Sequence, residues 1–132
     1  MLKKLRSLAQ AGLIERLDKH SNYLGDLHND NDEDKTECFV ADTEEDLTNV
    51  DFHNIDLSYS DFDYARLCCS DFSNTFLTGA TLCGADLEYA NFSNAYLKDA
   101  DLRGCIVTGA IFSGAELSGA MLPDNFAKDI LH

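Results

Sequence analysis

Basic side chains are scarce in this sequence of 132 residues, which has 10 Lys and Arg against 24 Asp and Glu and a formal net charge of −14. Proteins that bind nucleic acids or anionic membranes do so largely by neutralising phosphates with Lys and Arg. The composition therefore argues against direct binding to either. It favours solubility and, for any protein partner, a basic surface.

Long apolar runs are missing too, since none approaches the 18 residues of a membrane-spanning helix. The stretch 1–17 is charged throughout and lacks a small-residue cleavage site, so no secretory signal is predicted. The five cysteines match no zinc-binding spacing, and adjacent Cys68 and Cys69 are poorly placed to pair with each other. We interpret all five as reduced thiols and expect a cytoplasmic location.

The apolar residues follow neither the 3.6-residue period of a helix nor the 2-residue period of a strand. A large apolar residue stands instead at every fifth position from Leu47 to Leu122. Identical residues recur every 20 positions, as in the series Phe52, Phe72, Phe92 and Phe112. This repeat predicts a square coil of four five-residue sides per turn, in which like residues stack. The small residue two places before each large one should also point inward, and Gly or Asn suits the corners.

The repeating unit A-(D/N)-(L/F)-x-x over residues 45–124 resembles the pentapeptide-repeat family. The resemblance implies an all-β fold, a right-handed quadrilateral β-helix, here of about four coils. Members of that family often dimerise through a C-terminal helix. Some are quinolone-resistance or toxin-immunity proteins, in bacterial or phage settings, that act on DNA gyrase by imitating DNA. The array here is shorter than theirs and lacks their bulged loops.

The flanks of the array are predicted to be an N-terminal arm, 1–44, and a short C-terminal helical cap, 125–132. Apolar residues at helical spacing predict a helix over 2–18 that packs on the array. A basic amphipathic helix for a membrane surface or a partner is the alternative. An acidic loop is expected over 26–44. Within it, residues 38–41 are predicted to form a short strand that covers the first coil.

Part of the acidic loop begins like an EF-hand calcium site, with the spacing Asp30-x-Asp32-x-Asp34. Such a loop needs glycine at its sixth position and a bidentate Glu at its twelfth. Lys35 and Ala41 stand there instead, so no calcium site is predicted.

The array itself is strongly acidic, because residues 45–124 hold 3 basic and 13 acidic side chains, a net charge of 3 − 13 = −10. Four coils at ~4.8 Å make a rod ~19 Å long, with one net charge per ~1.9 Å against ~1.7 Å in duplex DNA. We therefore predict a DNA mimic that binds the basic surface of a topoisomerase such as gyrase, a nuclease or a CRISPR-type complex. A solvated acidic face without such a role is the alternative. The predicted partner-binding acids are Asp46, Asp51, Asp56, Asp61, Asp63, Asp86, Glu88 and Asp101.

An aromatic patch is predicted on the third side of the coil, where Phe76 and Tyr96 occupy outward positions 20 residues apart. We favour it as the seat of the N-terminal helix. The alternative makes it the partner-binding site of an interaction scaffold.

Apolar residues also occupy outward positions in the last coil, and these need cover. We favour a homodimer through this end over a cap formed by the chain's own tail. The residues concerned are Ile106, Ile111, Met121, Phe126, Ile130 and Leu131.

Catalysis finds little support, because His20, His28, His53 and His132 are scattered and no Ser/His/Asp or Cys/His set converges on the coil map. We predict a protein that is not an enzyme and that has no cofactor or metal site.

Overall fold

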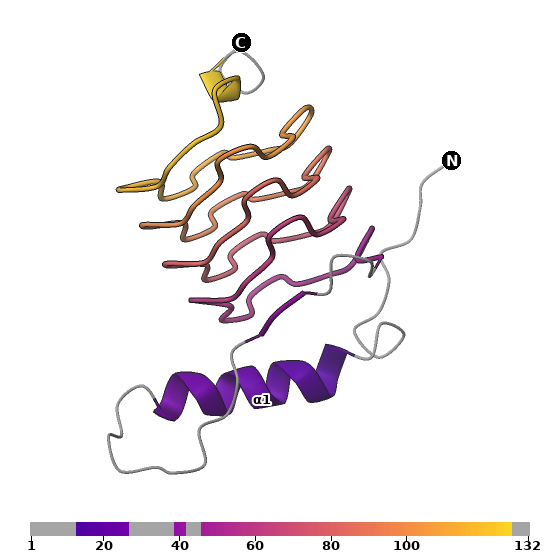
Figure 1. The fold of residues 1–132 in the computed structure, drawn as a ribbon, viewed down its shortest axis with the longest axis vertical. Helices are drawn as coiled ribbons and strands as arrows, with labels where there is room; N and C mark the ends of the chain where they lie inside the picture. The colour runs from indigo at the N-terminus through magenta and orange to yellow at the C-terminus, as the bar shows by residue number, and fades with distance from the viewer. Residues whose placement is uncertain (1–12, 27–38, 42–45, 128–132) are drawn as a thin grey trace.

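The computed structural model describes residues 13–26, 39–41 and 46–127. This part of the chain has the α-helix α1 (Leu13–Asp26), followed by a stack of coils and by a helical start at 126–127 (Figure 1). The rest of the C-terminal helical cap predicted over 125–132 lies outside the described residues. Within the stack the sides pair as parallel single-residue bridges between positions 20 apart, for example Asp71↔Asn91 and Phe76↔Tyr96. The coil of 20 residues that the sequence predicts is therefore confirmed.

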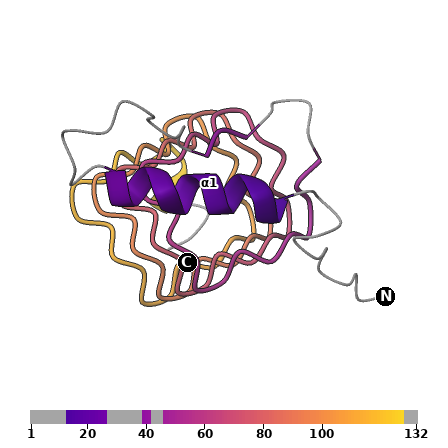
Figure 2. The same ribbon diagram turned by 90° about the horizontal axis from the view of Figure 1, so that it is seen from below.

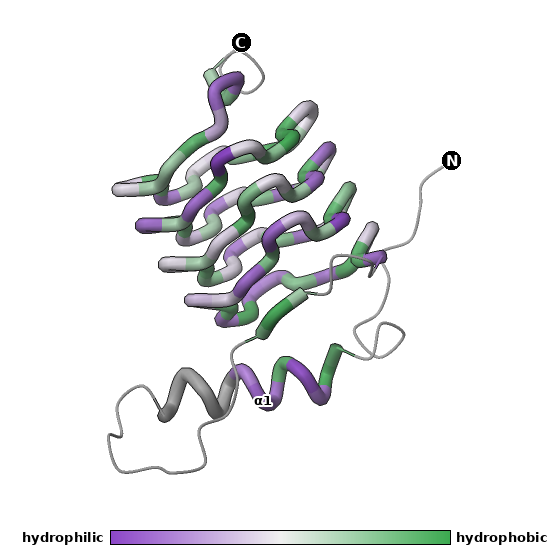
Figure 3. Tube along the Cα trace, viewed as in Figure 1, coloured by the Kyte–Doolittle hydropathy of each residue, from purple (hydrophilic) through white to green (hydrophobic). Residues whose placement is uncertain are grey.

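The interior of the stack is a set of ladders of identical side chains. Neighbouring rings of Phe52, Phe72, Phe92 and Phe112 have centroids 4.9 Å apart and planes within 13° of parallel. Burial of a side chain of this size stabilises the fold by about 1.5–3 kcal/mol. The hydropathy along the chain changes sign within every side, as expected if central residues point inward and their neighbours outward (Figure 3).

The residue two places before the central one is also buried from Ser60 to Ala110, as predicted, and is partly buried at Ile55, Ala115 and Ala120. Ala80 and Ala90 are inaccessible to solvent. Thr75 is equally buried, and its hydroxyl donates a hydrogen bond to the carbonyl oxygen of Phe52 at 2.8 Å. The hydroxyl groups of Ser70 and Thr75 at these inward corners are thus satisfied by the backbone of the preceding coil.

Each side ends in a tight turn whose third residue has a positive φ. The turn around Cys69, for example, is closed by the N–H of Ser70, which donates to the carbonyl oxygen of Leu67 at 3.1 Å. Glycine and asparagine occupy many of these corners, as predicted, because they tolerate this conformation. The sequence did not predict that tyrosines occupy three of them: Tyr59, Tyr64 and Tyr89.

α1 closes the N-terminal end of the stack. Seen from below, it lies across the outline of the superimposed coils (Figure 2). Leu13 and His20 are buried and Leu17 packs on the core. The buried Nδ1 of His20 accepts a hydrogen bond from the backbone N–H of Phe39 at 2.9 Å, and the ring of Phe39 lies 5.1 Å from that of Phe62.

The prediction of a helix over 2–18 followed by a loop from residue 26 was wrong at its C-terminal boundary. α1 continues to Asp26, and residues 1–12 lie outside the described part of the chain. The buried stripe continues at His20, a polar residue that a search for apolar spacing passes over. None of the helices in the described ranges has the length and apolarity needed to cross a membrane.

Of the short strand predicted over 38–41, the described residues 39–41 form a single parallel bridge to the first coil. Val40 bridges Asp61 in parallel, and the N–H of Ala41 donates to the carbonyl oxygen of Asp61 at 2.7 Å. Residue 38 and the calcium-like stretch 30–37 lie outside the described residues.

Candidate interaction surfaces

In seven of the five-residue sides, the backbone N–H left over by the pairing between coils donates to the carboxylate of an outward aspartate two residues earlier. In the side centred on Leu87, the N–H groups of residues 86, 87, 89 and 90 all donate to backbone oxygens, at 2.8–3.0 Å. The fifth N–H, that of Glu88, donates to Oδ1 of Asp86 at 3.1 Å. The same bond recurs at Asp46, Asp51, Asp56, Asp61, Asp71 and Asp101. Where an aspartate precedes the central residue, its side chain is therefore part of the turn.

Asn91 shows that this turn does not need a negative charge. Its Oδ1 accepts the N–H of Ser93 at 3.0 Å, in the same geometry as the aspartates. An amide oxygen and a carboxylate oxygen are thus interchangeable acceptors here. The turn therefore does not require the negative charges that the seven aspartates carry.

The predicted partner-binding acids do not gather on one face; the coil distributes them over all four. Six of them lie in the four outward columns of bridging residues, each of which holds residues 20 apart, and Asp63 and Glu88 stand two places further along the chain. One column alternates Asp46, Arg66 and Asp86, and another places Asp51 directly before Asp71. Acidic side chains therefore surround the stack on all four sides.

Asp101 does not belong to the accessible acidic surface, contrary to the prediction. It is 8% exposed, and its Oδ2 lies 2.7 Å from Nη2 of Arg103. Hydrogen bonding from Arg103 lowers the pKa of this carboxyl to about 2. The positive charge of Arg103 therefore compensates the negative charge of Asp101.

The aromatic patch of Phe76 and Tyr96 is exposed. The two rings are stacked with centroids 4.6 Å apart and planes 4° from parallel. Phe76 is 42% exposed and Tyr96 is 45% exposed. The prediction that this patch seats the N-terminal helix was wrong, because α1 covers the end of the stack and leaves the third side open (Figures 1 and 2).

The C-terminal end is partly covered by the chain itself. Phe126 is buried and its ring meets Phe112 edge-on, with centroids 5.1 Å apart. Leu122 occupies an inward central position but is 37% exposed, and an open hollow lies beside it. Ile106, Ile111 and Met121 are exposed as predicted, and Ile130 and Leu131 lie outside the described residues.

The four described cysteines are free thiols, and Cys68, Cys69 and Cys83 are partly exposed. Burial raises the pKa of Cys68 to about 11, and the neighbouring thiol of Cys69, 3.4 Å away between sulfur atoms, adds to the effect. Burial also raises the pKa of Cys105 to about 12, and its Sγ donates to the carbonyl oxygen of Leu82. Because only the thiolate is nucleophilic, neither Cys68 nor Cys105 is suited to covalent catalysis.

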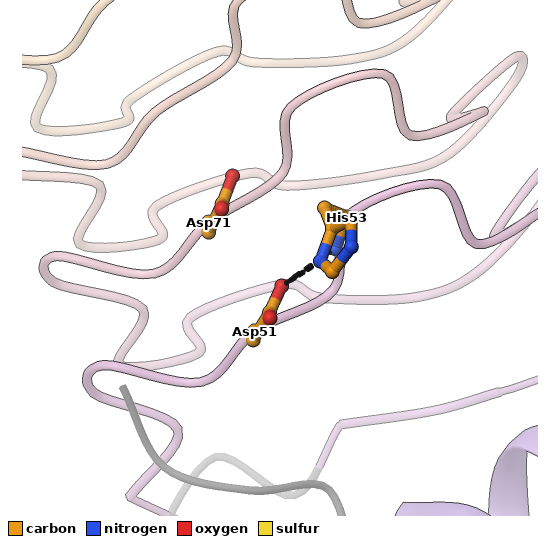
Figure 4. Close-up of side chains that lie close together, drawn as sticks. All are labelled: Asp51, His53 and Asp71. Carbon is orange, nitrogen blue, oxygen red and sulfur yellow. Dashed lines mark hydrogen bonds and ion pairs between the residues drawn. The ribbon is translucent and has the colours of Figure 1, made fainter. Parts of the chain in front are cut away.

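Three potential ligand groups that the sequence analysis did not connect come together on the second side. Figure 4 shows His53 beside Asp51, with Asp71 in the next coil. The ligand atoms of the three side chains all lie within 4.8 Å of one another. A hydrogen bond donated by the ring to the carboxylate of Asp51 raises the pKa of His53. The 20-residue register would have revealed this group, since Asp51 and Asp71 share a column and His53 is two residues from one of them.

A family model described as pentapeptide repeats matches residues 46–74, 69–104 and 95–124, with eight copies. Among solved structures, the chain is 40% identical to HetL, a pentapeptide repeat protein involved in heterocyst differentiation regulation from the cyanobacterium Nostoc sp. strain PCC 7120. The TM-score is 0.62, and the match covers 64% of this chain and 39% of HetL. Such proteins form right-handed β-helices, which agrees with the predicted fold.

A second similar structure is a pentapeptide repeat protein from the thylakoid lumen of Arabidopsis thaliana, with 35% identity and a TM-score of 0.58. The match covers 60% of this chain and 55% of that protein, so the chain spans only part of either relative. A search of curated proteins gave no match. Pentapeptide repeat proteins are typically structural or interaction proteins rather than enzymes.

Proposed function

The chain belongs to the pentapeptide-repeat family, and we propose that it is a non-enzymatic acidic protein that binds the DNA-binding surface of a DNA-handling enzyme. The partner would be a topoisomerase such as gyrase, a nuclease or a CRISPR-type complex. The chain would occupy the basic groove that otherwise holds duplex DNA, and so inhibit or protect the enzyme.

The observation that carries this proposal is the choice of aspartate where asparagine serves the fold equally well. Asn91 caps its turn with an amide oxygen, yet seven equivalent positions carry a charge. Like charges crowded on a small rod oppose folding by mutual repulsion. The presence of aspartate at these positions is explained if the negative charge serves in binding. The electrostatic complement of such a surface is a basic surface on the partner.

The spacing of the charges supports the same partner. Neighbouring coils are separated by about 4.8 Å along the axis, and the predicted acids are distributed over all four sides of the stack, although only Asp51 and Asp71 follow each other directly in one column. Duplex DNA likewise presents charge around its whole circumference, at about one charge per 1.7 Å of axis. A protein surface built to neutralise phosphates would therefore meet a comparable density of negative charge.

The test uses substitutions that remove charge and keep the turn. In Asp46→Asn/Asp56→Asn/Asp61→Asn each new amide oxygen can accept the backbone N–H, so circular dichroism and the unfolding midpoint should change little. Binding to purified gyrase, to a nuclease and to a CRISPR-type complex is measured by fluorescence anisotropy, with duplex DNA as competitor. We expect the triple variant to bind at least about tenfold more weakly, with a shallower salt dependence.

Asn91→Asp is the matched gain-of-charge variant, because it adds a carboxylate to an existing cap. It should strengthen the same complex. Equal affinities of the parent protein, the triple variant and Asn91→Asp for every partner that binds would eliminate the proposal, as would binding that duplex DNA does not displace.

The aromatic patch favours a second candidate function, a protein interaction scaffold. Its support is the absence of cover: within the described part of the chain nothing packs over Phe76 and Tyr96. In this case Phe76→Ala/Tyr96→Ala would abolish partner binding with little salt dependence. Tyr64→Ala removes an exposed aromatic from a different corner and is the control.

Two further features are part of the proposal. Exposed Ile106, Ile111, Met121 and Leu122 support a homodimer through the C-terminal end. The free thiols of the described cysteines support a cytoplasmic site of action.

A further inference from the structure

The outward columns of the stack separate their carboxylates, with one exception. In three columns the residue that bridges the first-coil aspartate is not an acid: Arg66 follows Asp46, Phe76 follows Asp56, and Thr81 follows Asp61. In the remaining column Asp51 bridges Asp71 directly. Like charges directly opposite one another across a pair of strands are destabilising. A cation held between these two carboxylates would remove that repulsion.

The histidine of the array lies at this exception. His53 is the one histidine in residues 46–124, and it stands beside Asp51 and Asp71 (Figure 4). Its Nδ1 is in contact with Oδ1 of Asp51. The three side chains offer ligand atoms that all lie within 4.8 Å of one another. Ligands about 2.0–2.2 Å from a shared ion lie at most about 4.4 Å apart, so small rotations of the side chains suffice to enclose one.

We propose that Asp51, His53 and Asp71 bind one divalent transition-metal ion of the Zn²⁺ class. An imidazole nitrogen with two carboxylate oxygens suits Zn²⁺, Co²⁺ or Ni²⁺, whereas Mg²⁺ and Ca²⁺ prefer oxygen ligands throughout. Water completes the coordination on the exposed side. The ion links the first coil to the second, and the inference does not depend on the partner proposed above.

The surrounding backbone holds the ligands in place. Oδ1 of Asp51 accepts the N–H of His53 at 3.0 Å, and Oδ1 of Asp71 accepts the N–H of Ser73 at 2.9 Å. The buried rings of Phe52 and Phe72, next to these residues in sequence, stack 4.9 Å apart. Hydrogen bonds of this kind, which orient ligating carboxylates, are common around metal sites.

The same geometry has a competing explanation without a metal. In that case a protonated His53 forms an ion pair with the carboxylate of Asp51. The two accounts differ in what the protein does with a metal salt alone. The experiment therefore uses tag-free full-length protein and ZnCl₂ in isothermal titration calorimetry. CoCl₂ is used in parallel, with visible absorption reporting coordination geometry and ¹H–¹⁵N NMR locating the perturbed residues.

We expect binding of one Zn²⁺ per chain, with changes in the NMR spectrum confined to the second side around residues 51–53 and 71–73. His53→Asn and Asp71→Asn should each weaken binding at least about tenfold. Asp71→Asn keeps the turn, since Asn91 makes the same cap, so its loss of affinity is not a folding defect. Asp86→Asn removes a charge from another column without touching the site and should bind Zn²⁺ like the parent protein.

Metal should also raise the thermal unfolding midpoint of the parent protein and of Asp86→Asn, but not that of His53→Asn. No binding up to about 1 mM Zn²⁺, which corresponds to a weak millimolar affinity, would overturn the proposal. Equal affinity in the parent protein and His53→Asn would overturn it as well.

Discussion

The ring of Tyr59 lies over Gly79, one coil further along the chain, so closely that a Cβ built on the glycine would stand 2.7 Å from the ring. Both residues occupy turn positions with positive φ, +65° at Tyr59 and +68° at Gly79. The same relationship links Tyr64 with Gly84 and Tyr89 with Gly109. At these corners a tyrosine in one coil packs on a glycine in the next.

Gly79→Ala should therefore destabilise the protein through two effects, a strained positive φ and a clash with Tyr59. Gly104→Ala isolates the first effect, because φ is +73° there but the nearest atom to a new Cβ is 3.6 Å away. We expect a loss of about 1 kcal/mol in Gly104→Ala and of about 2–3 kcal/mol in Gly79→Ala, measured by urea unfolding. Tyr59→Ala should recover part of the loss in Gly79→Ala. Equal losses in the two glycine variants would show that the ring yields without cost.

The corners also show where prediction from the sequence ended. The five-residue period predicted which side chains point inward, because the spacing of Phe52 and Phe72 depends only on the length of a coil. It predicted Gly and Asn at the corners from their intrinsic preferences. Tyr59 has no such preference, and its place depends on packing against a glycine in another coil, which local pattern does not contain.

The position of α1 was missed for a related reason. In the sequence, the exposed aromatic patch and the amphipathic N-terminal segment each need an apolar surface to pack on. The prediction therefore packed the one on the other. The helix instead covers the open end of the core, where Phe39 and His20 meet. Covering an end satisfies the unpaired core of the first coil, which every solenoid must cap. The acids, by contrast, were placed outward correctly, apart from Asp101, which Arg103 covers.

The phenylalanine ladder should be most sensitive at its centre. Phe72 contacts two stacked neighbours, Phe52 and Phe92, and is fully buried. Phe72→Ala should lower the free energy of unfolding by about 3–5 kcal/mol, since it leaves a cavity that rigid coils on either side cannot fill. Phe112→Ala, nearer the C-terminal end and 8% exposed, should cost less. Similar losses in the two variants, measured by urea unfolding, would argue against a ladder supported from both sides.

Stability should depend on pH through His20. Burial lowers the pKa of this side chain, although the Asp56 carboxylate acts in the opposite direction. The unfolded chain therefore takes up a proton before the folded one does as the pH falls. The contribution of His20 is fully present above pH ~6.5 and is lost as the pH drops through the lowered folded value. Protonation of Nδ1 would also remove the acceptor of the Phe39 N–H.

We expect the free energy of unfolding to decrease between pH 7.5 and 5 in the parent protein and to change less in His20→Ala. His53 contributes the opposite slope, because hydrogen bonding to Asp51 raises its pKa. The comparison is therefore best made in a His53→Asn background. A pH dependence that is the same with and without His20 would assign it to other groups.

The end of the stack opposite α1 should decide the oligomeric state. Leu122 points into the core yet is 37% exposed, while Phe126 covers the neighbouring ladder. If a second copy covers this end, sedimentation velocity should show a dimer that dissociates on dilution. Leu122→Glu should then be a monomer at every concentration, because a carboxylate buried in an apolar contact costs several kcal/mol. Thr108→Glu introduces the same single negative charge at an exposed site on a different side and should leave the dimer intact. A parent protein that sediments as a monomer at all concentrations would instead make the tail a self-contained cap.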